Sequence, residues 1–315
     1  SCVELANKTG IDTGEVRHQL RTARKKLFDV RELRTRPGLD DKILTSWNGL
    51  MIRAMAYAGR QLAQPAYIDS AARAATDIHT RLWQHNRLLA TSRKGHAHLN
   101  AYLDDYAFII SGLIELLQSR WNSEWLLWAQ QLADVLIEQF EDNANGGFFF
   151  TSHDHEQLIQ RSKNYSDDAT PSGNGSAAES LLVLGYLLAE PKYIDAAENC
   201  LKAAWSSINQ AAISHCSLLE ALDLQLDPPQ IIILRGSTDE LEQWLQPATA
   251  KFMPHCHVFA IPEDDKLPPS LSEKSMSDST LAYICEGMQC SEPISSREEW
   301  EALIADCTAT LDQVQ

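Results

Sequence analysis

Three stretches of this 315-residue chain repeat the same order of elements, an extended segment followed by two helices. Each repeat carries an Asp-Asp doublet just before its first helix or at its start, and the second aspartates of successive doublets lie 64 and 63 residues apart. The doublets are Asp40-Asp41, Asp104-Asp105 and Asp167-Asp168. Self-similarity at a constant period is typical of repeat architectures, in which each unit buries its apolar face against its neighbours. The sequence therefore predicts a stack of helical hairpins.

Apolar residues recur in these repeats every three to four positions, which is the period of a helix with one buried face. The first helices are expected at 46–62, 103–117 and 176–188, their partners at 66–83, 123–140 and 192–207, and a further helix at 211–226. The first helix of each pair is apolar on more sides, so it belongs in an inner layer with the second helix outside it. Extended segments are expected at 87–92 and at 146–151, the latter paired with 156–161. The predicted fold is mainly α, a partial (α/α)6 toroid.

The C-terminal part differs in pattern. Pro228-Pro229 interrupt the helical periodicity, and short apolar runs at 231–234, 257–261 and 281–288 favour strands. Ser237 and Ser296 are expected to cap helices between and after these strands. We therefore predict two domains, a helical-hairpin portion at 1–227 and a small α/β appendage at 228–315. The appendage lacks a glycine-rich phosphate loop, which favours a structural role.

Charge is distributed unevenly along the chain. The first 36 residues carry nine Lys or Arg and five Asp or Glu, which leaves 18 basic and 38 acidic residues, a net charge of −20, in the remainder. A body this acidic repels phosphate backbones and anionic lipids, so neither nucleic acid nor membrane is expected as a partner. The sequence also lacks a secretory signal and any apolar run of the roughly 18 residues that a membrane span needs. A cytoplasmic protein is expected.

The seven cysteines are odd in number and irregularly spaced, which argues against a disulfide framework. Cys285 and Cys290 have four residues between them, which fits neither a CxxC redox pair nor a zinc knuckle. Reduced thiols are therefore expected. His255-Cys256-His257 has no second ligand cluster at a suitable spacing, so no metal and no other cofactor is expected.

If the hairpins stack side by side, the N-terminal ends of the inner helices point to one rim and the doublets gather around one cavity. Crowded carboxylates raise one another's pKa, which supplies a protonated acid and an ionised base, as hydrolysis of a glycosidic bond requires. The predicted catalytic residues are Asp41, Asp105 and Asp168, and the other members of the doublets, Asp40, Asp104 and Asp167, are predicted to bind the ligand. Neighbouring aromatic side chains can stack on sugar faces and polar groups can bind hydroxyls. The predicted ligand-binding residues of these kinds are Trp47, Tyr106, Arg161, Ser172, Gly173 and Asn174.

Two alternatives stay open on these residues. Histidines near the same rim, such as His98 and His153, are suitable bases for an epimerase or isomerase. Aspartate is also a common cap at helix N-termini, so the doublets fit a non-catalytic binding or scaffold toroid equally well. A sugar-like small molecule is the expected ligand in either enzymatic case.

The runs "RTRPGLDDKILTSWNGLMIRAMAYAGR", "YLDDYAFIISGLIELLQ", "GGFFFT", "DDATPSGNGSAAESLLVLGYL" and "AYICEGMQCSEPI" resemble, in the same order, the spermatogenesis-associated protein 20 family. The resemblance implies a six-hairpin glycosidase-like (α/α)6 barrel, similar to N-acylglucosamine 2-epimerase and cellobiose epimerase, and a role in carbohydrate metabolism. It adds Lys42 and Asn48 to the expected ligand-binding residues. It also implies a thioredoxin-like domain as a partner, which this sequence does not contain, and with which a non-catalytic toroid would work.

Overall fold

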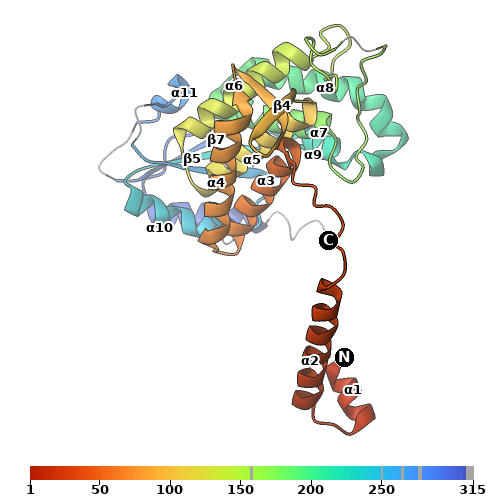
Figure 1. Ribbon diagram of the computed structural model, residues 1–315. Helices are drawn as coiled ribbons and strands as arrows, with labels where there is room; N and C mark the ends of the chain where they lie inside the picture. Colours follow the sequence, from red (N-terminus) through yellow and green to blue (C-terminus); the bar gives the residue numbers. More distant parts are fainter. Residues whose placement is uncertain (157–158, 250, 264–265, 276–278, 310–315) are drawn as a thin grey trace. The chain divides into compact units, whose positions relative to one another are not determined.

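The computed structural model describes residues 1–156, 159–249, 251–263, 266–275 and 279–309 (Figure 1). The chain forms two compact units, Ser1–Asp41 and Lys42–Gln315. The first unit is a pair of helices, α1 (Cys2–Thr9) and α2 (Thr13–Glu32), the second of which is capped by the side chain of Asp12. The domain division predicted at residue 228 falls within the second unit and stays a prediction.

The second unit contains the predicted helical hairpins. Each inner helix packs against the next, and each of the first three packs against its own outer helix (Figure 1). The inner helices are α3 (Thr45–Gln61), α5 (Leu103–Ser119), α7 (Gly173–Leu188) and α9 (Cys216–Leu226), the last preceded by a 3-10 turn, η1 (Ala212–Ser214). The outer helices are α4 (Pro65–Leu82), α6 (Ser123–Phe140) and α8 (Pro191–Gln210). This arrangement confirms the prediction of a mainly α fold built as part of an (α/α) toroid.

The two central inner helices are buried on nearly every side. In α5, 14 of 17 residues are buried, and in α7, 14 of 16. Glycines allow α3 and α5 to approach closely, since a Cβ at Gly49 would lie 2.6 Å from the carbonyl carbon of Phe108. α3 packs mainly against α4 and α5 and leaves a face with Trp47 and Met51 exposed. The predicted burial of the inner helices is therefore correct for α5 and α7 and incomplete for α3.

A small antiparallel sheet lies between the first and second hairpins. It contains β1 (Ile43–Leu44), β2 (Trp83–Gln84), β3 (Arg87–Arg93) and β4 (His96–Asn100), with β3 pairing to the other three. The strand predicted at 87–92 is confirmed. Its partner β4 was not predicted, because its residues are mostly exposed and show no apolar alternation.

The strand predicted at Gly146–Thr151 is wrong. This segment forms only an isolated bridge between Glu141 and Phe148. Gly146 and Gly147 have φ values of 73° and 74°, which a strand cannot accommodate. In the return strand predicted at 156–161, residues 157–158 lie outside the described residues and the others are not in a strand.

The C-terminal part is a four-stranded sheet in the order β6-β5-β7-β8, with β5 parallel to β6 and the other pairs antiparallel. Its strands are β5 (Gln230–Arg235), β6 (Cys256–Ile261), β7 (Leu281–Glu286) and β8 (Gln289–Cys290). One face, with Ile231 and Phe259, joins the core of the helical hairpins. The other face is covered by α10 (Thr238–Thr249) and α12 (Arg297–Ala309), which contact it through Trp244 and Trp300. The predicted α/β appendage is thus present.

The loop expected at 264–279 contains one short helix, α11 (Pro269–Ser272), while residues 264–265 and 276–278 lie outside the described residues. No helix among the residues that the structure describes is long and apolar enough to cross a bilayer.

The expectation of reduced thiols is wrong for one pair. Cys285 and Cys290 form a disulfide, with their Cα atoms 3.9 Å apart. They are directly opposite each other in β7 and β8, because the hairpin turns at Gly287. A spacing of four residues, which fits no CxxC motif, is the spacing that a tight hairpin needs to bring two cysteines together.

Candidate functional site

The N-terminal ends of the inner helices meet at one end of the second unit, which we call the rim. Asp105 lies in the first turn of α5, and its side chain accepts the backbone N–H of Tyr102 at 2.9 Å. The other carboxylate oxygen accepts the backbone N–H of Ser46, in the first turn of α3, at 2.8 Å. Asp105 therefore joins the beginnings of two inner helices.

Asp167 performs the same task for the next pair of inner helices. Its side chain accepts the backbone N–H of Ser172 at the start of α7 at 2.8 Å and that of Ser217 in α9 at 3.0 Å. Burial acts to raise the pKa of Asp167, but the hydrogen bonds from Ser217 and Ser172 outweigh it and lower the pKa. One aspartate in each of these two doublets thus holds helix ends together.

Asp104 is the contrasting member of its doublet. It is half-buried and accepts no hydrogen bond and forms no ion pair among the described residues. Its carboxylate lies against the first residue of α7, where a Cβ at Gly173 would come within 2.2 Å of Asp104 Oδ1, so a larger residue there would require the Asp104 side chain to move. Burial raises the pKa of Asp104 to about 6. A carboxyl group that is partly protonated and has no hydrogen-bond partner among the described residues is a candidate proton donor.

Asp104 opens into a cavity of about 380 Å³ at the rim, which we call the rim cavity. Its walls come from the β1, β3 and β4 strands, the first turns of α3 and α5, and the loop before α7. Tyr102 and Phe150 stack there with ring centres 4.8 Å apart and planes 12° apart. The lining residues are Lys42, Leu44, Ser46, Ala90, Thr91, His98, Leu99, Tyr102, Asp104, Asp105 and Phe150.

Three predicted ligand-binding residues are buried and used inside the protein instead. The hydroxyl of Tyr106 accepts the N–H of Leu88 at 2.9 Å, and the Tyr106 side chain is fully buried. The Asn174 amide is bonded to both backbone groups of Phe148, and Ser172 caps α7. The polar groups of these three residues thus have partners inside the protein, and their role in ligand binding stays a prediction.

The remaining predicted residues do not line the rim cavity. Trp47 is 66% exposed, and Asn48 donates to the carbonyl of Leu44 at 2.8 Å. Arg161 donates to the carbonyl of Thr151 and lies over the ring of Phe149 at 4.1 Å. Three aspartates, Asp40, Asp41 and Asp168, are exposed, and the first two belong to the first unit. Of the predicted residues, Lys42, His98, Asp104 and Asp105 are therefore the ones that the rim cavity brings together.

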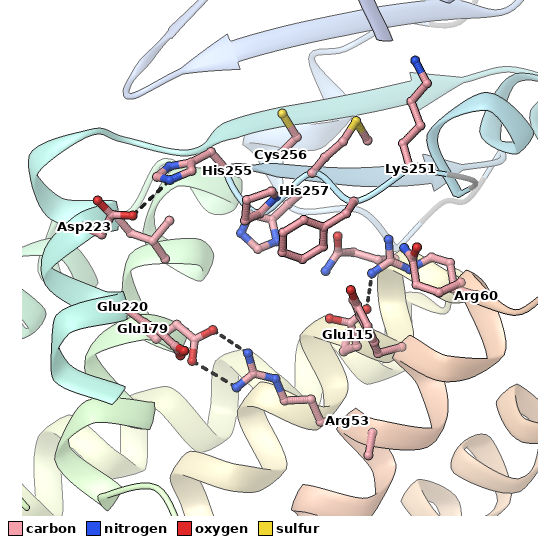
Figure 2. Close-up of a pocket in the computed structure, with 18 of the residues that line it drawn as sticks. Arg53, Arg60, Glu115, Glu179, Glu220, Asp223, Lys251, His255, Cys256 and His257 are labelled. Atoms are coloured by element: carbon pink, nitrogen blue, oxygen red, sulfur yellow. Dashed lines mark hydrogen bonds and ion pairs between the residues drawn. The ribbon is translucent and has the colours of Figure 1, made fainter. Parts of the chain in front are cut away.

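A second cavity, of about 540 Å³, lies between the inner helices and the segment 251–257, and we call it the inner cavity (Figure 2). Two ion pairs cross it between inner helices, one from α3 to α7 and one from α3 to α5. Arg53 binds Glu179 through two hydrogen bonds of 2.7 and 3.1 Å, and Arg60 pairs with Glu115. These four residues were not predicted from the sequence. The signal was a stripe of charged residues at helical spacing, such as Arg53 and Arg60, on helices that are otherwise apolar.

The wall of the inner cavity that faces the appendage carries histidines. His255 Nε2 lies 3.0 Å from Asp223 in α9. Burial lowers the pKa of His257 to about 3, and the charges of Arg60 and Arg53 contribute to the shift. His257 is therefore uncharged at neutral pH. Within the described part of the chain, no group of three or more His, Cys, Asp or Glu side chains is placed to hold a metal ion.

Comparison with known proteins supports the family resemblance and the fold. No family model matches the chain. The chain is 28% identical to human spermatogenesis-associated protein 20 over 95% of its own length and 40% of that protein, and 26% identical to an uncharacterized protein of Caenorhabditis elegans over 95% of its own length and 43% of that protein. These relatives confirm the resemblance, and the chain spans about 40% of their length.

Among solved structures, the GH76 alpha-mannanase of Bacteroides thetaiotaomicron matches 88% of this chain and 72% of its own, with a TM-score of 0.50 and 13% identity. The similarity agrees with the toroid fold.

Proposed function

We propose that this chain belongs to a carbohydrate-active protein and that it binds a sugar in the rim cavity, with Asp104 as the proton donor. The observation that supports the proposal is the state of Asp104. It lines the cavity, has no partner among the described residues, and its pKa is raised by burial to about 6. The fold, which a GH76 alpha-mannanase shares, makes sugars the first ligands to test.

The other groups in the rim cavity favour proton transfer over two-carboxylate hydrolysis. Hydrolysis requires a second carboxylate that is available to water or substrate. Asp105 is the nearest one in sequence, but both of its oxygens accept backbone N–H groups. His98, which lines the cavity from β4, is a suitable base. An acid and a base on one cavity can remove a proton from the carbon next to a sugar carbonyl and return one, as epimerases and isomerases do.

The stacked rings of Tyr102 and Phe150 provide an apolar surface in the same cavity. Aromatic faces bind the C–H side of sugar rings, and the hydroxyl groups of Ser46 and Thr91, the latter donating to the carbonyl of Ile43 at 3.0 Å, line the same cavity. A ligand of one or two sugar units matches a cavity of about 380 Å³.

A second candidate is a non-catalytic sugar-binding or scaffold toroid. It is favoured by Asp105 and Asp167, because each of these aspartates is fully used in joining two helix ends. In this case the rim cavity binds a ligand without converting it, in a longer protein that also contains a thioredoxin-like domain.

The test is proton exchange in deuterated water. We expect a reducing sugar from a panel of hexoses and disaccharides to gain deuterium at C2, observed by proton NMR, when incubated with the purified chain. Asp104→Asn and His98→Asn should abolish the exchange, whereas Asp168→Asn, a matched change at an exposed doublet residue, should leave it intact. Saturable binding without exchange would support the non-catalytic candidate. Full exchange by Asp104→Asn would refute the proposed role of Asp104.

A further inference from the structure

The inner cavity contains two internally neutral ion pairs. The guanidinium group of Arg53 binds both carboxylate oxygens of Glu179, and Arg60 pairs with Glu115. The side chains of Arg60 and Glu115 are each only 12% exposed, so this pair is shielded from solvent ions. Neither arginine therefore offers an uncompensated positive charge to a ligand.

One carboxylate of the inner cavity is left without a partner of its own. Glu220, on α9, accepts no hydrogen bond and forms no ion pair among the described residues, and it lies beside Glu179 (Figure 2). Lys251 does not neutralise it, because its ammonium group donates to the carbonyl of Ile304 at 3.1 Å and points away from the other labelled residues (Figure 2). The side of the cavity formed by α9 therefore carries excess negative charge.

Other polar groups of the same cavity also lack hydrogen-bond partners. The side chain of Gln118 lines the cavity, and although this residue is only 3% exposed, its amide forms no hydrogen bond among the described residues. Arg60 Nε and His257 Nε2 are buried without a hydrogen-bond partner. Buried polar groups in native proteins are nearly always paired, with protein, water or ligand. A ligand with hydroxyl groups could pair with these three side chains.

The apolar part of the wall includes Leu50, Tyr57, Leu224 and Phe252. Mixed apolar and polar walls around a volume of about 540 Å³ are typical of sites for small molecules. We propose that the inner cavity is a second binding site, for a small polyhydroxylated molecule that carries a protonated amino group. The amino group binds Glu220, and the hydroxyl groups bind Gln118, Arg60 and His257. This inference does not depend on the function proposed for the rim cavity.

Three open-chain compounds that differ only at one end test the proposal. Glucamine carries an ammonium group at C1, sorbitol a hydroxyl group and gluconate a carboxylate. We expect isothermal titration calorimetry of the chain to show the tightest binding for glucamine, binding about fivefold weaker for sorbitol, as for the loss of one partly exposed charge pair, and the weakest for gluconate. Equal affinities for all three, a preference for gluconate, or no binding of any would overturn the proposal.

Variants assign the preference to the inner cavity. Glu220→Gln should reduce glucamine binding about fivefold and leave sorbitol binding unchanged, whereas Glu242→Gln, an equal change of charge on α10 outside the cavity, should alter neither. Gln118→Met should weaken both compounds, because it removes the amide and preserves the size of the side chain. Unaltered glucamine binding in Glu220→Gln would contradict the assignment.

Discussion

Replacing Asp104 by asparagine should stabilise the protein above pH 6. Burial raises the pKa of Asp104 from its ordinary value of 3.8 to about 6, so the unfolded state loses its proton first as pH rises. Between about pH 4 and pH 6 the Asp104 carboxyl is ionised in the unfolded state but still protonated in the folded state, so the free energy of unfolding falls as pH rises. The loss is complete above the folded-state pKa. At about 1.4 kcal/mol per unit, the shift is worth at most about 3 kcal/mol. Asparagine has no charge to desolvate, and Asp104 has no hydrogen bond to lose among the described residues.

Urea unfolding of the wild type and Asp104→Asn at several pH values tests this reasoning. Near pH 4 the two proteins should have similar free energies of unfolding. At pH 8 the variant should be more stable by up to about 3 kcal/mol, with an unchanged dependence on urea. A difference that is the same at both pH values, or a less stable variant at pH 8, would refute a burial-raised pKa at this residue.

Three further changes should act in the opposite direction, each measured by urea unfolding. Asp105→Asn should destabilise by about 1–3 kcal/mol, because one backbone N–H of α3 or α5 loses its acceptor; a stabilised variant would contradict the joining role of Asp105. Asn174→Ala should cost about 3 kcal/mol, since it leaves both buried backbone groups of Phe148 without this partner, and a cost below 1 kcal/mol would argue against that role. Reducing the Cys285–Cys290 disulfide should cost about 2 kcal/mol, as expected for so short a loop, and the double Cys→Ser variant should show no effect of reductant.

The helical layers could be predicted because their periodicity is strong and local. The helices expected at 66–83 and 123–140 agree with α4 and α6 within a residue or two, since their apolar residues are spaced for one buried face. The strand expected at 146–151 failed for a different reason. Its run of three phenylalanines has high strand propensity, but the two glycines before it adopt left-handed backbone angles that end any extended pairing. In the folded chain the backbone angles of the glycines prevail over the strand propensity of the phenylalanines.

The candidate site was predicted in part. The doublet at the start of α5 was found because it recurs, but recurrence alone does not tell which aspartate a helix end uses. In the second doublet Asp105 is used, and in the third Asp167, which is the first member. The inner cavity was not predicted, because its residues are separated by more than a hundred positions in sequence, as Arg53 and Glu179 are, and only the stacked hairpins bring them together.

The regular recurrence of the Asp-Asp doublets has a structural explanation. Asp104, which does not share that structural role, is the residue that suggests chemistry. Asp105 and Asp167 each accept backbone N–H groups at the starts of two neighbouring inner helices. Helix N-termini need such acceptors. An aspartate with this role would therefore recur at the repeat length without any ligand. Asp104 and Asp168 are the members left over, and they differ in burial rather than in sequence context. Asp168 is exposed, whereas Gly173 allows α7 to approach Asp104 and partly exclude water from it. Because desolvation without a hydrogen bond destabilises a carboxylate, Asp104 is the aspartate whose position a fold would not select for stability alone.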